Sequence, residues 1–121
     1  MRRAVLLSLL ALAACGPDGP PAPTFDGAYN GQSWLLAGPA ECGLAAPLPN
    51  RLSVTNGEAS IQFATVPVRG RLGANGELNQ LRAAQPAEGA EAQGQITSGT
   101  AEMRYRHGEC QWSFQGRRPP G

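Results

Sequence analysis

Few side chains in this sequence have the types and spacing that catalysis or metal binding requires. The chain has 121 residues, with three Cys and a single His. That histidine, His107, lies in the turn-like stretch Arg106-His107-Gly108-Glu109. A general base needs a nucleophile and an orienting partner, and the sequence offers no such set. One His without clustered carboxylates gives no ordinary metal site. We therefore expect an exposed turn histidine, no catalytic residue, no metal and no cofactor.

The first cysteine follows the features of a secretory signal. Arg2-Arg3 give a positive start, residues 4–12 form a compact apolar run, and the small residues Ala13-Ala14 precede Cys15. The run is shorter than the ~20 residues that cross a bilayer as a helix. This order predicts a cleaved signal peptide over residues 1–14. The alternative is an ordinary signal peptide in which Cys15 stands at this position by chance.

The stretch Leu12-Ala13-Ala14-Cys15 resembles the lipobox of bacterial lipoproteins. The resemblance implies that the Cys15 thiol carries a diacylglycerol thioether, and that the new amino terminus is acylated, for example with palmitate. Each buried methylene contributes about 0.8 kcal/mol, so several chains hold a protein at the membrane almost permanently. Gly16 stands where an Asp in this family signals inner-membrane retention. The resemblance therefore implies the outer membrane, facing the periplasm.

A short tether separates the anchor from one domain. Residues 15–24 are rich in Pro, which keeps a segment extended at ~3.1 Å per residue, on the order of 30 Å in all. Residues 25–118 form one domain and residues 119–121 a disordered tail. From Cys15 onward the chain has eight Arg, no Lys and nine Asp plus Glu. This near-neutral balance argues against a nucleic-acid binder.

Alternating apolar and polar residues predict an all-β domain. Ala101, Met103 and Tyr105 alternate with charged residues, and Asn56-Gly57 is a hairpin signal that Asn75-Gly76 repeats. We expect a small antiparallel meander of eight strands that closes as a barrel or flattened sandwich. The expected strand centres are Trp34, Val54, Ile61, Arg69, Leu81, Gln93, Met103 and Trp112. Gly70 and Gly94 interrupt this pattern and are expected at bends or bulges.

Two further cysteines fit this plan. Cys42 follows the first expected strand and Cys110 opens the last. The periplasm is oxidising, so we expect them to form a disulfide that staples the closing seam between these strands. The alternative is a pair of free buried thiols.

Two surface features could bind a partner. Arg69, Arg71, Arg104 and Arg106 are expected on outward strand faces, where they could meet an acidic lipid head group or protein; the alternative is a solvated strand face. Three consecutive apolar residues, Trp34–Leu36, cannot all face one core. One of them is therefore exposed, unless the loop to Cys42 covers the strand end.

The overall plan resembles small periplasmic lipoproteins, and also the lysozyme-inhibitor lipoproteins, whose domain is an eight-stranded β-barrel. In that family a Ser-Gly segment enters the lysozyme cleft. Here Ser98-Gly99 lies at an expected turn with Tyr105 further on, and the match is confined to this dipeptide. We expect a non-catalytic module that the lipid anchor holds at the membrane, binding or supporting an envelope protein. The alternative is an inhibitor of a periplasmic hydrolase such as lysozyme.

Overall fold

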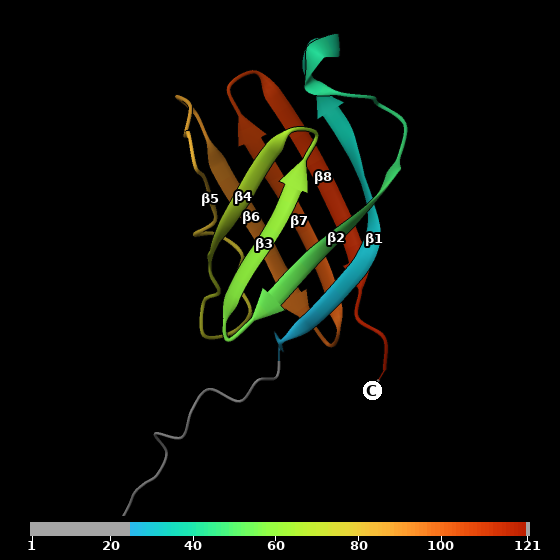
Figure 1. Ribbon diagram of the computed structural model, residues 1–121, viewed down its shortest axis with the longest axis vertical. Coiled ribbons are helices and arrows are strands. Elements are labelled where there is room, and N and C mark those ends of the chain that lie inside the picture. Colours follow the sequence, from blue (N-terminus) through green and yellow to red (C-terminus); the bar gives the residue numbers. More distant parts are fainter. Residues whose placement is uncertain (1–24, 121) are drawn as a thin grey trace, which may run out of the picture.

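The computed structural model describes residues 25–120, and they form an antiparallel β structure (Figure 1). The eight strands and one short 3-10 turn are β1 (Gly27–Ala37), η3 (Ala40–Cys42), β2 (Leu48–Thr55), β3 (Glu58–Phe63), β4 (Val66–Arg71), β5 (Arg82–Ala83), β6 (Glu91–Thr97), β7 (Thr100–His107) and β8 (Cys110–Arg117). This confirms the predicted fold class and strand number. Only the fifth strand misses its expected centre, since Leu81 lies just before it.

The strands form one sheet in the order β5-β4-β3-β2-β1-β8-β7-β6. The first and last strands are antiparallel neighbours, as predicted, with Asn30 opposite Arg117. The two edges of the sheet, β5 and β6, are not paired with each other. Part of the β4–β5 connection lies along β6 instead, through a bridge from Glu77 to Gln95. The sheet is therefore a nearly closed barrel whose incomplete seam lies between β5 and β6.

Alternation along the strands fills the barrel interior. In β7 the side chains of Ala101, Met103 and Tyr105 are buried, and Glu102 and Arg104 are exposed. Successive side chains of a strand point to opposite faces, which explains this pattern. The largest fully buried side chains are those of Tyr29, Tyr105, Phe63, Phe114, Leu52, Leu78, Leu81, Ile96 and Val68.

One of the two Asn-Gly hairpin predictions is confirmed. Asn56 and Gly57 join β2 to β3 with φ values of 53° and 79°, as the two-residue hairpin turn requires. The prediction for Asn75-Gly76 is wrong. Here the Gly76 N–H donates to the Gly73 carbonyl, and the Ile96 N–H donates to the Gly76 carbonyl. This turn therefore lies within the β4–β5 connection and directs it along β6.

Bends or bulges were expected at Gly70 and Gly94, and the bulges are absent. Both residues lie in regular ladders, opposite Ala59 and Met103. A Cβ at Gly94 would stand 2.5 Å from the Glu102 carbonyl oxygen, and one at Gly70 would stand 2.5 Å from that of Gln80. Glycine is needed at these positions because another backbone approaches closely.

The barrel has two distinct ends. The entry of the chain at Phe25 and the end of β8 lie at one end, and η3 and the β7–β8 turn lie at the other (Figure 1). No helix of the described residues is long and apolar enough to cross a membrane. The expected signal peptide, Cys15 and the whole of the expected tether lie outside the described residues, as does the last residue of the tail.

Candidate functional site

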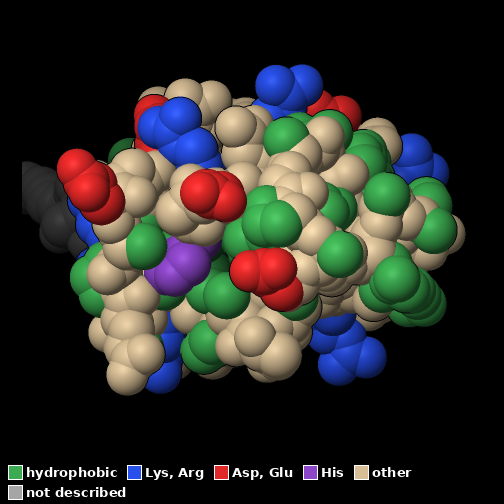
Figure 2. All heavy atoms as spheres, turned by 90° about the horizontal axis from the view of Figure 1, so that it is seen from above, with side chains coloured by type: hydrophobic (Ala, Val, Ile, Leu, Met, Phe, Trp, Pro, Cys, Tyr) green, Lys and Arg blue, Asp and Glu red, His purple; other side chains and the backbone are tan. Residues whose placement is uncertain are grey.

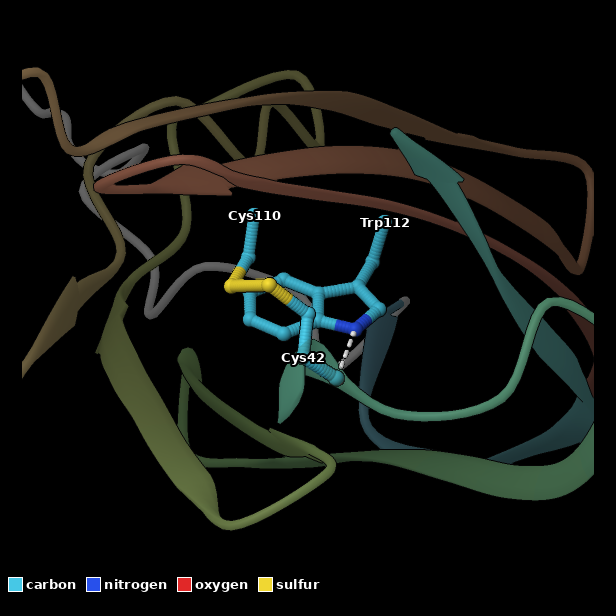
Figure 3. The surroundings of a disulfide bond; sticks show 3 residues. All are labelled: Cys42, Cys110 and Trp112. Carbon is cyan, nitrogen blue, oxygen red and sulfur yellow. Dashed lines mark hydrogen bonds between the residues drawn. A yellow bond between two sulfur atoms is a disulfide. The ribbon is translucent and has the colours of Figure 1, made fainter. Parts of the chain in front are cut away.

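The predicted disulfide joins Cys42 to Cys110, with their Cα atoms 5.6 Å apart. It connects η3 to the start of β8. Beside it, the indole Nε1 of Trp112 donates a hydrogen bond of 3.2 Å to the Cys42 carbonyl oxygen (Figure 3). These two links fasten the loop after β1 over this end of the barrel. They stabilise the paired side of the sheet, β1 against β8, and not the incomplete seam.

His107 lies within the fold, so the prediction of an exposed turn histidine is wrong. It is the last residue of β7 and is half-buried, because it shares the inward phase of Tyr105 two residues earlier. The two rings stack with their centroids 6.1 Å apart. The turn itself begins at Gly108, whose φ is 64°. The His107 Nδ1 atom is buried without a hydrogen-bond partner.

Aromatic rings fill the barrel below His107. Phe63 stacks on Tyr105 at 5.9 Å and on Trp112 at 5.6 Å between ring centroids. Burial raises the pKa of the Tyr105 hydroxyl above its ordinary value.

Within residues 25–120, no three His, Cys, Asp or Glu side chains are grouped so that they could hold a metal ion.

Arg104 and Arg106 lie on the outer face of β7, as expected, but their surroundings differ. Arg106 pairs with Glu91 at 2.8 Å and also donates to the Gly89 carbonyl oxygen. Arg104 has no ion pair with any described carboxylate. It lines a hollow of about 150 Å³, and the Arg106–Glu91 pair, Leu36 and Gln111 are among the other lining residues. Of the two arginines, only Arg104 therefore offers a charge that the fold leaves uncompensated.

The side wall of the barrel carries further arginines. Arg69 is paired with Glu58 at 3.2 Å, and Arg71 is exposed on the same strand. Viewed from the disulfide end, basic side chains lie around the periphery, and acidic ones lie both at the periphery and nearer the middle (Figure 2). Sequence reasoning did not single out Arg82, which lies opposite Arg69 on β5. Its alternation signal was weak because β5 has only two residues.

The apolar stretch Trp34–Leu36 is partly exposed. Leu35 packs against the core and Trp34 is half-buried, whereas Leu36 is 44% exposed. The loop to Cys42 therefore does not cover all three side chains. Because Leu36 borders the hollow beside Arg104, it adds an apolar wall to that surface.

Ser98 and Gly99 form the β6–β7 turn, with φ values of 52° and 82°. The turn is at the end where the chain enters and leaves the barrel, since the Arg118 N–H donates to the Gly99 carbonyl oxygen. Arg104 is further along β7 on its outer face, and Tyr105 is buried in the core. The structure therefore does not bring the turn, Tyr105 and the arginines together into one site.

Neither a protein-family description nor a curated protein nor a solved structure matches this chain.

Proposed function

We propose that this protein is a non-catalytic envelope lipoprotein, tethered through Cys15, whose β barrel binds an acidic partner on its side wall. The observation that carries the binding proposal is the unpaired Arg104 beside the hollow that Leu36 and Gln111 also line. An arginine with an adjacent apolar wall suits a carboxylate flanked by apolar groups, because guanidinium and carboxylate geometries match. The partner is an acidic protein of the envelope.

The position of this surface suits a tethered protein. The chain enters the barrel at Phe25, beside the end of β8 (Figure 1). Leu36 and Gln111 lie toward the opposite end, where β1 ends and β8 begins. With an anchor ten residues before Phe25, this surface lies toward the end of the barrel that is remote from the proposed anchor. The outer membrane facing the periplasm is the location that we propose for it.

Site-specific crosslinking in the native envelope tests the binding proposal. A photoreactive residue at Gln111 should give a discrete adduct with an acidic protein, and Arg104→Gln in the same chain should remove most of it. The matched control is Arg51→Gln on β2, an exposed arginine that bonds to Asn30. Equal yields in all three proteins would reject the Arg104 surface.

The hydrolase-inhibitor alternative has less support. In this fold Tyr105 is buried and Ser98-Gly99 lies at the tethered end of the barrel. A lysozyme assay with the full-length protein in detergent tests it directly. Inhibition that Ser98→Ala abolishes would replace our proposal with the inhibitor function.

A further inference from the structure

We propose that the seam between β5 and β6 binds a carboxylate group. The seam is the one place where neighbouring strands of the described barrel are not paired. A hollow of about 740 Å³ lies there, and Asn79, Arg82, Glu91 and Gln93 are among its lining residues. The seam hollow shares Glu91 and Gln93 with the Arg104 hollow, but Arg82 and Asn79 line only the seam hollow. The proposal does not depend on the lipid anchor.

A backbone donor of β6 points into the seam. The Gly94 N–H donates to the Asn79 Oδ1 at 3.1 Å, and the Ile96 N–H donates to the Gly76 carbonyl oxygen at 2.9 Å. Backbone groups of alternate residues face the same side of a strand, so the Ala92 N–H faces the seam as well. Ala92 is only 4% exposed, and no described residue accepts a hydrogen bond from its N–H on this side. Because Ala92 lines the hollow, its N–H is available to an acceptor that enters there.

A side-chain donor lies beneath the same opening. Tyr105 is 1% exposed, and its hydroxyl is buried without a hydrogen-bond partner. Its ring is held between neighbours on other strands, including Phe63. Tyr105 stands opposite Ala92 in the β6–β7 ladder, so its ring projects into the barrel from the strand next to β6.

The charge at the seam favours an anion. Arg82 is exposed, donates only to the Leu81 carbonyl oxygen at 3.4 Å, and has no ion pair among the described residues. Across the seam, the carboxylate of Glu91 is paired with Arg106. A carboxylate has about four acceptor positions and can accept from an amide, a hydroxyl and a guanidinium together.

The connections around the seam bear on what can enter. Residues 84–90 connect β5 to β6, and the pairing of Glu77 with Gln95 joins the β4–β5 connection to β6. The seam is therefore closed on two sides, which favours one side chain or a small molecule over an additional strand. The carboxylate is therefore supplied either by a small free acid or by an Asp or Glu side chain that a partner protein inserts.

The test is a titration of the full-length, 15N-labelled protein in detergent micelles, followed by NMR. Acetate at constant ionic strength, with chloride as the matched salt, represents the free acid. A capped Gly-Ala-Glu-Ala-Gly peptide represents an inserted side chain, and its Gln counterpart is the control. We expect a saturable downfield shift of the Ala92 amide proton with acetate, with the Glu peptide, or with both. Chloride and the Gln peptide should produce none, and whichever probe binds more tightly identifies the source.

Two variants connect that response to the named donors. Tyr105→Phe keeps the stacked ring, and Arg82→Gln keeps an exposed polar side chain; each should weaken carboxylate binding about tenfold. Arg117→Gln, an exposed arginine near the other end of the barrel, should bind as the wild type does. An Ala92 amide that responds to no carboxylate, and so contacts water only, would overturn the proposal. Unchanged affinity in both Tyr105→Phe and Arg82→Gln would overturn it as well, and neither result would affect the Arg104 surface.

Discussion

Trp112 donates its indole hydrogen bond to the carbonyl oxygen of Cys42, the residue whose sulfur is joined to Cys110. Trp112 and Cys110 are two residues apart on β8, so one strand secures the loop after β1 twice. The loop has little else to hold it, since η3 is only three residues long. These two links make the disulfide end of the barrel the first place to test its stability.

Replacing both Cys42 and Cys110 with Ala should destabilise the domain by about 2–5 kcal/mol, because the bridge constrains a large part of the unfolded chain. Thermal unfolding followed by circular dichroism measures the effect, and the reduced wild type should behave like the double variant. A Tm equal to that of the oxidised wild type would show that the fold does not depend on this bridge.

Trp112→Phe should cost about 1–3 kcal/mol, because it removes the hydrogen bond to Cys42 and leaves core volume unfilled. The disulfide should remain, which mass mapping without reduction would establish. Trp34→Phe is the matched control: Trp34 is half-buried on the outer side of β1, so its loss should cost less than about 1 kcal/mol. Equal effects of the two substitutions would contradict the structural role given to Trp112.

Stability should fall in alkaline solution. Burial raises the pKa of Tyr29 and of Tyr105 above the ordinary value of 10.0. The folded state therefore holds these phenolic protons more tightly than the unfolded state does. Their contribution is fully present below pH 10 and is lost as the pH rises through the folded pKa values. Urea unfolding at pH 8, 10 and 11 measures this trend, and Tyr105→Phe should flatten it. Stability that rises over this interval would contradict the sign.

Replacing Arg106 should affect stability more than replacing Arg104, whereas replacing Arg104 should affect partner binding more. Arg106→Gln breaks the pair with Glu91, whose two side chains are 45% and 50% exposed, and should cost about 0.2–1 kcal/mol. Arg104→Gln removes no ion pair and should change stability by less than about 0.5 kcal/mol, yet it should weaken partner binding more. Chemical unfolding of the two variants measures which loses more stability, and crosslinking yields measure which loses more partner binding. A larger binding loss in Arg106→Gln would reject the assignment.

The sequence predicted the fold well because its strands are short, amphipathic and separated by strong turn signals. Ala101, Met103 and Tyr105 define β7 by alternation alone, and the positions of Cys42 and Cys110 indicated that the first and last strands are neighbours. The seam could not be predicted in this way. Its position depends on the turn at Gly76, which directs the chain along β6, and the spacing of an Asn-Gly pair does not reveal which strand will be its neighbour.

The candidate site was predicted only in part. Outward residues such as Arg104 follow from strand phase, but whether a carboxylate neutralises them depends on tertiary pairing, as between Arg106 and Glu91. His107 was misplaced because the stretch around it resembles a turn, although β7 continues through His107 itself. Arg82 was missed because its strand has only two residues, too few to show alternation.

Mass spectrometry of the amino terminus of the mature protein tests the central claim, that a lipid at Cys15 tethers this barrel to the envelope. The account predicts that the wild-type chain begins at Cys15 and carries a diacylglyceryl thioether and an amide-linked acyl chain. It also predicts that Cys15→Ser yields a chain without lipid that no longer partitions into detergent. A wild-type chain with an unmodified Cys15, or a Cys15→Ser chain that is retained with the membrane as the wild type is, would contradict the account.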